Sequence, residues 1–401
     1  MTTTPVTSRT DMTRRRILAT AAAAGLGATV PLGVPRHAWA APAAPGPARL
    51  TLPAPTGPHP VGTVPLHLVD TARPDPVAGP GRHRELMAAV WYPARTAAGL
   101  PRAPWMAEGA LRAFLADVGF PLDPALGPLT AGLTGAPVHR TGHRLPVVVY
   151  SHGSASHRGD HTVIVQELAS HGFAVVTVDH TYDTFTEFPD GRVVTPAADV
   201  PMYPKDFAAD LRFLLDCVAE LAAGHNPDVD GRALPPGLLG ALDPRHVGAF
   251  GWSKGGTATA LTMLADRRVS AGLGIDGPMQ PTITTDLDRP FMMMTADFTR
   301  AAMPDIAEFW THLRGWRLDI QAEGAVHNSY GDNATLIPQA GAILGMTDQE
   351  IQSWVGTLDP ARSVSIQQAY PRAFFDLQLR HRGGQLLDGP SPAFPEVTFL
   401  P

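Results

Sequence analysis

The sequence predicts an α/β protein whose mostly parallel central sheet is covered by helices on both faces. Continuous apolar runs recur along the chain, and such runs are typical of parallel strands that are buried on both sides. Between them lie stretches whose apolar residues recur at helical spacing. Strands that alternate with helices indicate right-handed crossovers within one sheet.

The first half of the chain contributes four expected strands and one helix. The strands at 61–70 and 84–92 flank a turn region rich in Pro, Gly and Asp, and they are expected at an edge of the sheet. The run 145–150 (Leu-Pro-Val-Val-Val-Tyr) predicts a fully buried strand. A helix is expected over 160–171 from its spaced apolar positions, and 173–179 predicts the next buried strand.

The second half of the chain continues this alternation. Acidic residues lie between the apolar positions of the helix expected over 207–221, as in a helix with one solvent-facing side. The remaining elements follow the same two patterns. Strands are expected over 246–250, 271–275, 291–295 and 318–321, and helices over 256–264, 306–313 and 366–380.

A serine in a sharp strand-to-helix turn is the most informative feature of the chain. Ser253 lies in Gly251-Trp252-Ser253-Lys254-Gly255, the G-x-S-x-G pattern of the nucleophile elbow of α/β-hydrolases. The glycines are needed because the strand and the helix pass so close that a Cβ would clash. An ordinary Gly-rich turn with a capping serine is the alternative. The context predicts an α/β-hydrolase fold with Ser253 as nucleophile.

A serine hydroxyl needs a base at neutral pH, and the base needs an orienting carboxylate. In this fold class the acid and then the histidine follow the serine along the chain. Three histidines follow Ser253. His312 lies in an expected amphipathic helix, and His381 follows the last helix in a basic stretch. His327 lies in the loop after the last expected strand, where the catalytic histidine belongs, so His327 is the predicted base.

Two aspartates are candidates for the orienting acid. Asp276 ends the strand after the elbow helix, and Asp297 ends the following strand. Many α/β-hydrolases use the later position and some lineages use the earlier one. The residues alone favour Asp276 slightly, because its Gly-Pro flank fixes a tight turn at the strand end.

The developing oxyanion needs hydrogen-bond donors. One is expected to be the backbone N–H of Lys254, directly after the nucleophile, and the other the N–H of Ser154 in the loop after the first buried strand. A lysine is less usual than an apolar residue at position 254. Its side chain is expected in solvent, rather than lending positive potential to the mouth of the site.

A cluster of potential metal ligands lies in the same region as the expected oxyanion loop. It consists of His152, His157, Asp160 and His161, and two of its histidines are spaced as zinc ligands on one helix face can be. No further ligand is placed by the pattern. We therefore expect no metal and no organic cofactor.

The first forty residues predict an export signal of the twin-arginine type. Arg14-Arg15-Arg16 precedes a weakly apolar stretch, and Ala38-Trp39-Ala40 offers a small-x-small cleavage site. A membrane-spanning helix is the competing interpretation, but glycines and prolines interrupt the short apolar run. We expect residues 41–60 to form a Pro-rich linker and residues 61–401 to form the catalytic domain.

Composition restricts the class of protein further. The 401 residues carry a formal net charge of −6, and residues 1–40 hold five arginines and one aspartate, so the mature chain would be still more acidic. Nucleic acid is therefore not an expected partner. Cys217 is the single cysteine, which excludes an intramolecular disulfide.

Five segments together match a known family, namely 84–86, 90–94, 145–153, 168–173 and the elbow. They resemble the platelet-activating factor acetylhydrolase (plasma, group VII phospholipase A2) branch of α/β-hydrolases. Dienelactone-hydrolase-like and bacterial polyester-hydrolase enzymes are its neighbours. The similarity covers about 61–332. It implies Asp276 as the triad acid and His327 as the histidine.

The sequence departs from that family at three positions in the expected site. Ser154 replaces the usual leucine beside the oxyanion glycine, and Trp252 and Lys254 stand where histidine and an apolar residue are common. These changes bear on acyl-chain and head-group preference. The insertion 104–139 and the tail from residue 337 match no family and are candidates for a lid.

These observations together predict a secreted serine esterase that cleaves small-molecule or lipid esters of short or medium acyl chains, acetyl and phospholipid esters included. No transmembrane anchor is expected after removal of the signal, and the twin-arginine export machinery is an expected partner. The alternatives are an acyltransferase, lactonase or peptidase that uses the same triad, and a catalytically silent binding protein on the hydrolase scaffold.

Overall fold

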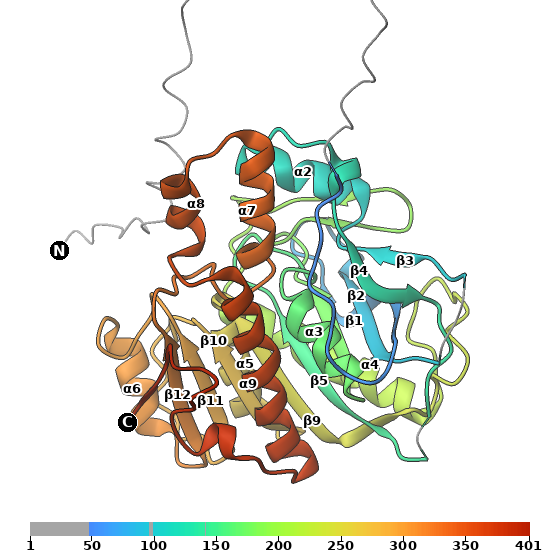
Figure 1. Ribbon diagram of the computed structural model, residues 1–401. Helices are drawn as coiled ribbons and strands as arrows, with labels where there is room; N and C mark the ends of the chain where they lie inside the picture. The colour runs from blue at the N-terminus through green and yellow to red at the C-terminus, as the bar shows by residue number, and fades with distance from the viewer. Residues whose placement is uncertain (1–47, 96–98, 141) are drawn as a thin grey trace, which may run out of the picture.

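The computed structural model describes residues 48–95, 99–140 and 142–401, and it confirms the predicted α/β architecture. Eleven strands form one sheet in the order β13-β12-β11-β10-β9-β5-β6-β2-β1-β4-β3 (Figure 1). The strands are β1 (Val61–Pro74), β2 (His83–Pro93), β3 (Arg102–Pro104), β4 (Leu129–Thr134), β5 (Leu145–Ser151), β6 (Ala174–Asp179), β9 (Leu242–Trp252), β10 (Val269–Ile275), β11 (Phe291–Thr295), β12 (Arg317–Ala322) and β13 (Val397–Leu400).

The neighbours from β6 through β5, β9, β10 and β11 to β12 pair in parallel, and β2 pairs antiparallel with β6. A short hairpin, β7 (Thr186–Glu187) and β8 (Val193–Val194), lies outside this sheet. The helices are α2 (Glu108–Val118), α3 (Thr162–Ser170), α4 (Pro204–Ala223), α5 (Lys254–Ala265), α6 (Pro304–His312), α7 (Asn333–Leu344), α8 (Asp348–Val355) and α9 (Pro360–Arg380).

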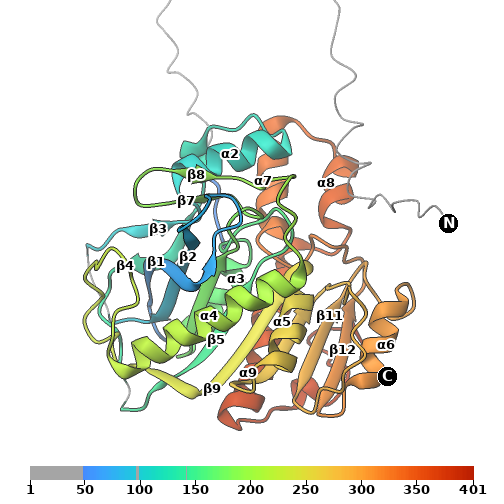
Figure 2. The ribbon, with the colours of Figure 1, turned by 180° about the vertical axis from the view of Figure 1, so that it is seen from behind.

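The helices cover both faces of the sheet. Helices α3 and α9 lie on the face seen in Figure 1, and α4 and α5 lie on the opposite face seen in Figure 2. Strand β5 shows how one apolar run serves both layers. Val147 and Val149 belong to the core under α4, whereas Val148 and Tyr150 belong to the core under α9. Each fully buried valine contributes about 1.5–3 kcal/mol of hydrophobic stabilisation.

The expected edge position of the first two strands is wrong. Strand β1 pairs with β2 on one side and in parallel with β4 on the other, and β3 lies beyond β4. Both additional strands come from the region around the insertion 104–139. Strands β3 and β4 are too short for their sequences to show the two-residue period of a strand. They join the sheet because β4 pairs with the open edge of β1 and β3 then pairs with β4.

A second part of the insertion joins the tail of the chain. Figures 1 and 2 show α2 beside α7, with α8 next to them, at one end of the sheet. Trp105 donates from its indole Nε1 to Gly159 O at 2.7 Å and to Asp332 Oδ2 at 2.8 Å. Phe120 packs edge-on against Trp354 of α8. The two unassigned segments therefore form one cap.

The described part of the expected linker packs on the domain. The amide of Thr56 donates to Glu167 Oε2 at 2.7 Å, and that of Gly57 to Ser170 Oγ at 3.1 Å, both on α3. The amide of Thr51 donates to Gln339 of α7 at 2.9 Å. Residues 48–60 are thus not a free tether, because polar side chains of two helices satisfy their backbone. The expected export signal lies outside the described residues.

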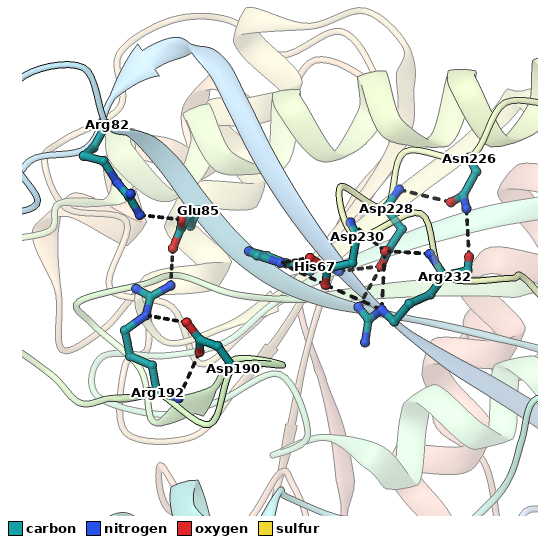
Figure 3. Close-up of polar contacts among 9 residues, drawn as sticks. All are labelled: His67, Arg82, Glu85, Asp190, Arg192, Asn226, Asp228, Asp230 and Arg232. Carbon is teal, nitrogen blue, oxygen red and sulfur yellow. Dashed lines mark hydrogen bonds and ion pairs between the residues drawn. The ribbon is translucent and has the colours of Figure 1, made fainter.

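A hydrogen bond and an ion pair fasten two long loops to the first strands (Figure 3). Asp228 accepts the amide of His67 in β1 at 2.9 Å and pairs with Arg232 at 2.7 Å. Glu85 of β2 pairs with Arg192, which lies between β7 and β8. The second contact matters for the site, because it anchors the loop that follows β6. None of the described helices combines the length and hydropathy needed to cross a bilayer.

Candidate active site

The elbow serine lies at the carboxyl end of β9, directly before α5. Ser253 has φ 55° and ψ −122°, a conformation that costs a non-glycine residue about 1–3 kcal/mol. Its amide donates to Ile275 O at 2.9 Å, which holds the turn against β10. A Cβ on Gly251 would lie 2.2 Å from Gly255 O, and one on Gly255 would lie 2.1 Å from Ser151 O. Both positions therefore require glycine.

Asp276 and His327 form a hydrogen-bonded pair beside this turn. The Asp276 Oδ2 and His327 Nδ1 atoms are 2.6 Å apart. The Asp276 side chain is fully buried, and its carboxylate also accepts the amides of Ala296 at 2.7 Å, Phe298 at 2.8 Å and Asp297 at 3.3 Å. These donors satisfy both oxygens of a carboxylate that is closed to water.

The other candidate acid has a different environment. Asp297 is exposed, and its Oδ2 accepts the backbone amide of His327 at 3.2 Å. It therefore supports the loop of the histidine and does not bond to the imidazole. This difference arises from where the His327 loop crosses the sheet edge, because both aspartates lie just after neighbouring parallel strands.

Aromatic side chains fix the His327 ring next to the elbow. The ring stacks on Trp252 at 4.7 Å between centroids and meets the edge of Phe298 at 5.0 Å. The indole Nε1 of Trp252 donates to His327 O at 3.0 Å. None of the hydrogen bonds of the described residues joins the Ser253 hydroxyl to His327. Such bonds are often long in ligand-free sites and shorten when substrate binds.

The expected oxyanion loop lies against the nucleophile. A Cβ on Gly153 would lie 2.5 Å from the Trp252 ring and 3.0 Å from the Ser253 Cβ, so only glycine allows this approach. Within the described part of the chain, neither the amide of Ser154 nor that of Lys254 donates a hydrogen bond. Both N–H groups are therefore available to a ligand.

The expectation of a solvated Lys254 side chain is wrong. Its Nζ pairs with Asp183 and donates to Met202 O at 2.8 Å, and the side chain is 20% exposed. Asp183 follows β6, far earlier in the chain than the elbow. The pairing depends on how the loop after β6 folds back, which no local pattern shows.

The residues considered as metal ligands have protein partners instead. His152 Nε2 accepts the amide of His180 at 3.0 Å, and His157 packs edge-on against Trp105. Asp160 binds the Tyr150 hydroxyl and lies 3.0 Å from His161 Nδ1. In the described ranges, no three His, Cys, Asp or Glu side chains are grouped so that they could hold a metal ion.

Sequence reasoning missed a buried polar chain beneath the oxyanion loop. Ser151 Oγ lies 2.8 Å from His180 Nε2, and His180 Nδ1 lies 2.9 Å from Asp210 Oδ2. Arg84 Nη2 donates to the same carboxylate at 2.7 Å. Burial opposes ionisation of Asp210, but Arg84 and His180 outweigh it and hold the pKa of Asp210 well below its usual range. These residues come from three elements and the loop after β6, so no sequence spacing could reveal them.

An apolar pocket with a cavity volume of about 70 Å³, partly open to solvent, lies inside the cap. Its lining side chains are aliphatic and aromatic, apart from Trp105 Nε1 and the polar side chains of Asp123 and Asn333. Asn333 belongs to this lining and bonds to Asn328, the residue after His327, at 3.4 Å. The other side chains that define the pocket include Leu111, Phe114, Leu115, Phe120, Leu336, Ile337 and Trp354.

Buried histidines make stability depend on pH. Burial lowers the pKa of His157 to about 4 and that of His180 to about 3. In the unfolded chain a histidine has a pKa of about 6.5, so below that pH it binds a proton that the folded protein does not bind until the pH reaches the lowered pKa. Each of the two histidines therefore destabilises the fold by about 2 kcal/mol at pH 5. Burial also raises the pKa of Asp332 to about 6, which offsets about 1 kcal/mol as pH falls.

We therefore expect the free energy of unfolding to fall by about 2–3 kcal/mol between pH 7 and pH 5. Urea unfolding at the two pH values measures it directly. Equal or greater stability at pH 5 would contradict this assignment of the buried protonation states.

Comparisons with known proteins agree with this fold. The family model described as platelet-activating factor acetylhydrolase, isoform II, matches residues 48–186. A probable 1-alkyl-2-acetylglycerophosphocholine esterase of Arthroderma benhamiae is 27% identical over 278 residues, which cover 65% of this chain and 68% of that protein. The platelet-activating factor acetylhydrolase of Cavia porcellus is 23% identical over 53% of this chain and 55% of its own length.

A solved structure extends the similarity. The ferulic acid esterase of Streptomyces cinnamoneus is 32% identical and has a TM-score of 0.74, and the match covers 88% of this chain and all of that one. Sheet order, helix layers and elbow define an α/β-hydrolase. Within that class, the chain is similar to platelet-activating factor acetylhydrolases and to a ferulic acid esterase, and it is a carboxylic ester hydrolase.

Proposed function

We propose that the protein is a serine esterase in which Ser253 attacks the ester carbonyl and forms an acyl-enzyme. His327 takes the serine proton as base and returns it to the leaving alcohol as acid, while Asp276 orients the imidazole. The N–H groups of Ser154 and Lys254 stabilise the oxyanion. The observation that carries the proposal is the 2.6 Å bond between Asp276 and His327 beside the strained elbow.

The substrate class follows from the relatives and from the site. The relatives are named for esters of acetylated glycerophosphocholines and of ferulic acid. Each of these has a small or planar acyl group, and no metal or cofactor is required by the residues assembled here. We therefore propose carboxylic esters of short or modest acyl groups as substrates.

A fluorophosphonate probe and an ester panel test this proposal. The probe should label one residue, identified as Ser253 by peptide mass spectrometry. Turnover of p-nitrophenyl esters, feruloyl esters and acetylated phospholipids of graded length would then define the acyl preference. Folded protein that is not labelled would favour a binding protein, and transfer of the acyl group to added alcohols would favour an acyltransferase.

We also propose that the protein is exported by the twin-arginine pathway. The support is the Arg14-Arg15-Arg16 signature and the Ala38-Trp39-Ala40 cleavage site. Replacing Arg14 and Arg15 together with lysine should keep the precursor inside the cell. Undiminished export of that variant would refute the route.

A further inference from the structure

We propose that Asp183 is a positioning residue that holds the two oxyanion donors in register. It does so with two bonds. One is to the amide of Ala155, the residue after Ser154, and the other is to the side chain of Lys254, whose backbone N–H is the second donor. This inference depends on the proposed function, because an oxyanion forms only if Ser253 acts as nucleophile. Asp183 itself contacts no reacting atom.

The two oxygens of one carboxylate carry out this role. Asp183 Oδ1 accepts the Ala155 amide at 2.7 Å, and Asp183 Oδ2 pairs with Lys254 Nζ. Ala155 has φ 50°, an uncommon conformation for a residue with a Cβ, so the loop needs an external contact to keep it. The two donor segments come from β5 and β9, and Asp183 bonds to both of them.

Asp183 is itself firmly placed. Its amide donates to His180 O at 2.9 Å, and His180 belongs to the buried chain with Ser151 and Asp210. The His180 ring stacks on the Phe207 ring at 3.7 Å between centroids. The Lys254 ammonium lies 5.1 Å from the centroid of the Phe207 ring. Asp183 is thus connected through His180 to Ser151, the residue from which the oxyanion loop begins.

The surroundings make this contact strong. The side chains of Lys254 and Asp183 are 20% and 11% exposed, so water screens their attraction only in part. Removal of one partner leaves the other charge partly buried without compensation. Oxyanion donors act because they are fixed before the charge develops. A loosened donor should therefore lower kcat and leave ground-state binding nearly unchanged.

The experiment compares Asp183→Ala, Asp183→Asn and Lys254→Met with a control, Asp190→Asn. Asp190 lies in the nearby turn between β7 and β8 and pairs with Arg192, and its side chain is 65% exposed (Figure 3). We expect Asp183→Ala to lower kcat about 10- to 100-fold, a part of what the loss of one oxyanion donor costs, with KM changed less than twofold. Asp183→Asn should lose less, because its amide oxygen can still accept from Ala155.

A trifluoromethyl ketone inhibitor supplies a readout that a purely structural role would not affect. The inhibitor forms a tetrahedral oxyanion adduct with the serine. In the Asp183 variants its affinity should therefore fall by the same factor as kcat, while the affinity for the product carboxylate stays unchanged. The control variant should match the wild type in every measurement. If Asp183→Ala does not fold, Asp183→Asn and Lys254→Met carry the comparison.

The outcomes separate this inference from the proposed function. Folded Asp183 and Lys254 variants that keep kcat and inhibitor affinity within twofold would overturn the positioning role, provided that Ser253→Ala is inactive. A rise in KM with unchanged kcat would overturn it as well. Turnover that survives in Ser253→Ala would instead overturn the proposed function.

Discussion

Replacement of Ser253 by alanine is expected to lower kcat for ester hydrolysis about 10⁶-fold, the scale seen when a serine hydrolase loses its nucleophile. The elbow holds the residue at φ 55° with its amide bonded to Ile275 O, so the fold at this turn does not depend on the hydroxyl. The variant should therefore retain its thermal stability while it loses acyl-enzyme formation. Initial rates with an activated ester and the melting temperature measure both.

Ser353→Ala provides a matched control for this variant. Ser353 is an exposed serine of α8 whose hydroxyl bonds to Glu350 O. Its replacement should leave turnover within twofold of the wild type. If Ser253→Ala kept more than about one hundredth of the activity, the nucleophile would have to be another group.

Replacement of Asp276 by asparagine is expected to lower kcat about 10⁴-fold, whereas Asp297→Asn should cost less than about tenfold. The amide of an asparagine would meet His327 Nδ1 with a donor or a weaker acceptor, and the imidazole would lose the tautomer that leaves Nε2 free to take the serine proton. Among the described residues, the Asp297 carboxylate bonds only to the backbone amide of His327, and an asparagine retains an oxygen for that contact.

The pair of variants is decisive because both residues follow neighbouring strands, but only Asp276 bonds to the imidazole of His327. Asp276 is fully buried and Asp297 is exposed. Melting temperatures show whether either variant loses the fold, and pH–rate profiles show whether the base is perturbed. A collapse of turnover in Asp297→Asn alone would transfer the orienting role to Asp297.

Local patterns were sufficient for the central layers of the molecule. The apolar run of β5 places alternate side chains in two cores, and a continuous run of this kind has few other stable environments. The elbow was recognisable for a similar reason. Gly251 is required by the close contact between β9 and α5, two elements that are adjacent in sequence, although Gly255 is required by the contact with Ser151 of β5. Features that depend on residues close together in the chain can be recognised from the sequence alone.

The edges, the cap and the electrostatics of the site were decided by the tertiary structure. Strand β4 pairs because β1 offers an open edge, and α2 meets α7 across more than two hundred residues. The choice between Asp276 and Asp297, and the partner of Lys254, depend on loops that cross the sheet edge. Sequence alone determined which residue types could perform ester chemistry and in what order they occur. Only the folded chain determined which of them meet. Hydrogen bonds and ion pairs act over a few ångströms, and here they join segments that are far apart in the sequence and share no local pattern.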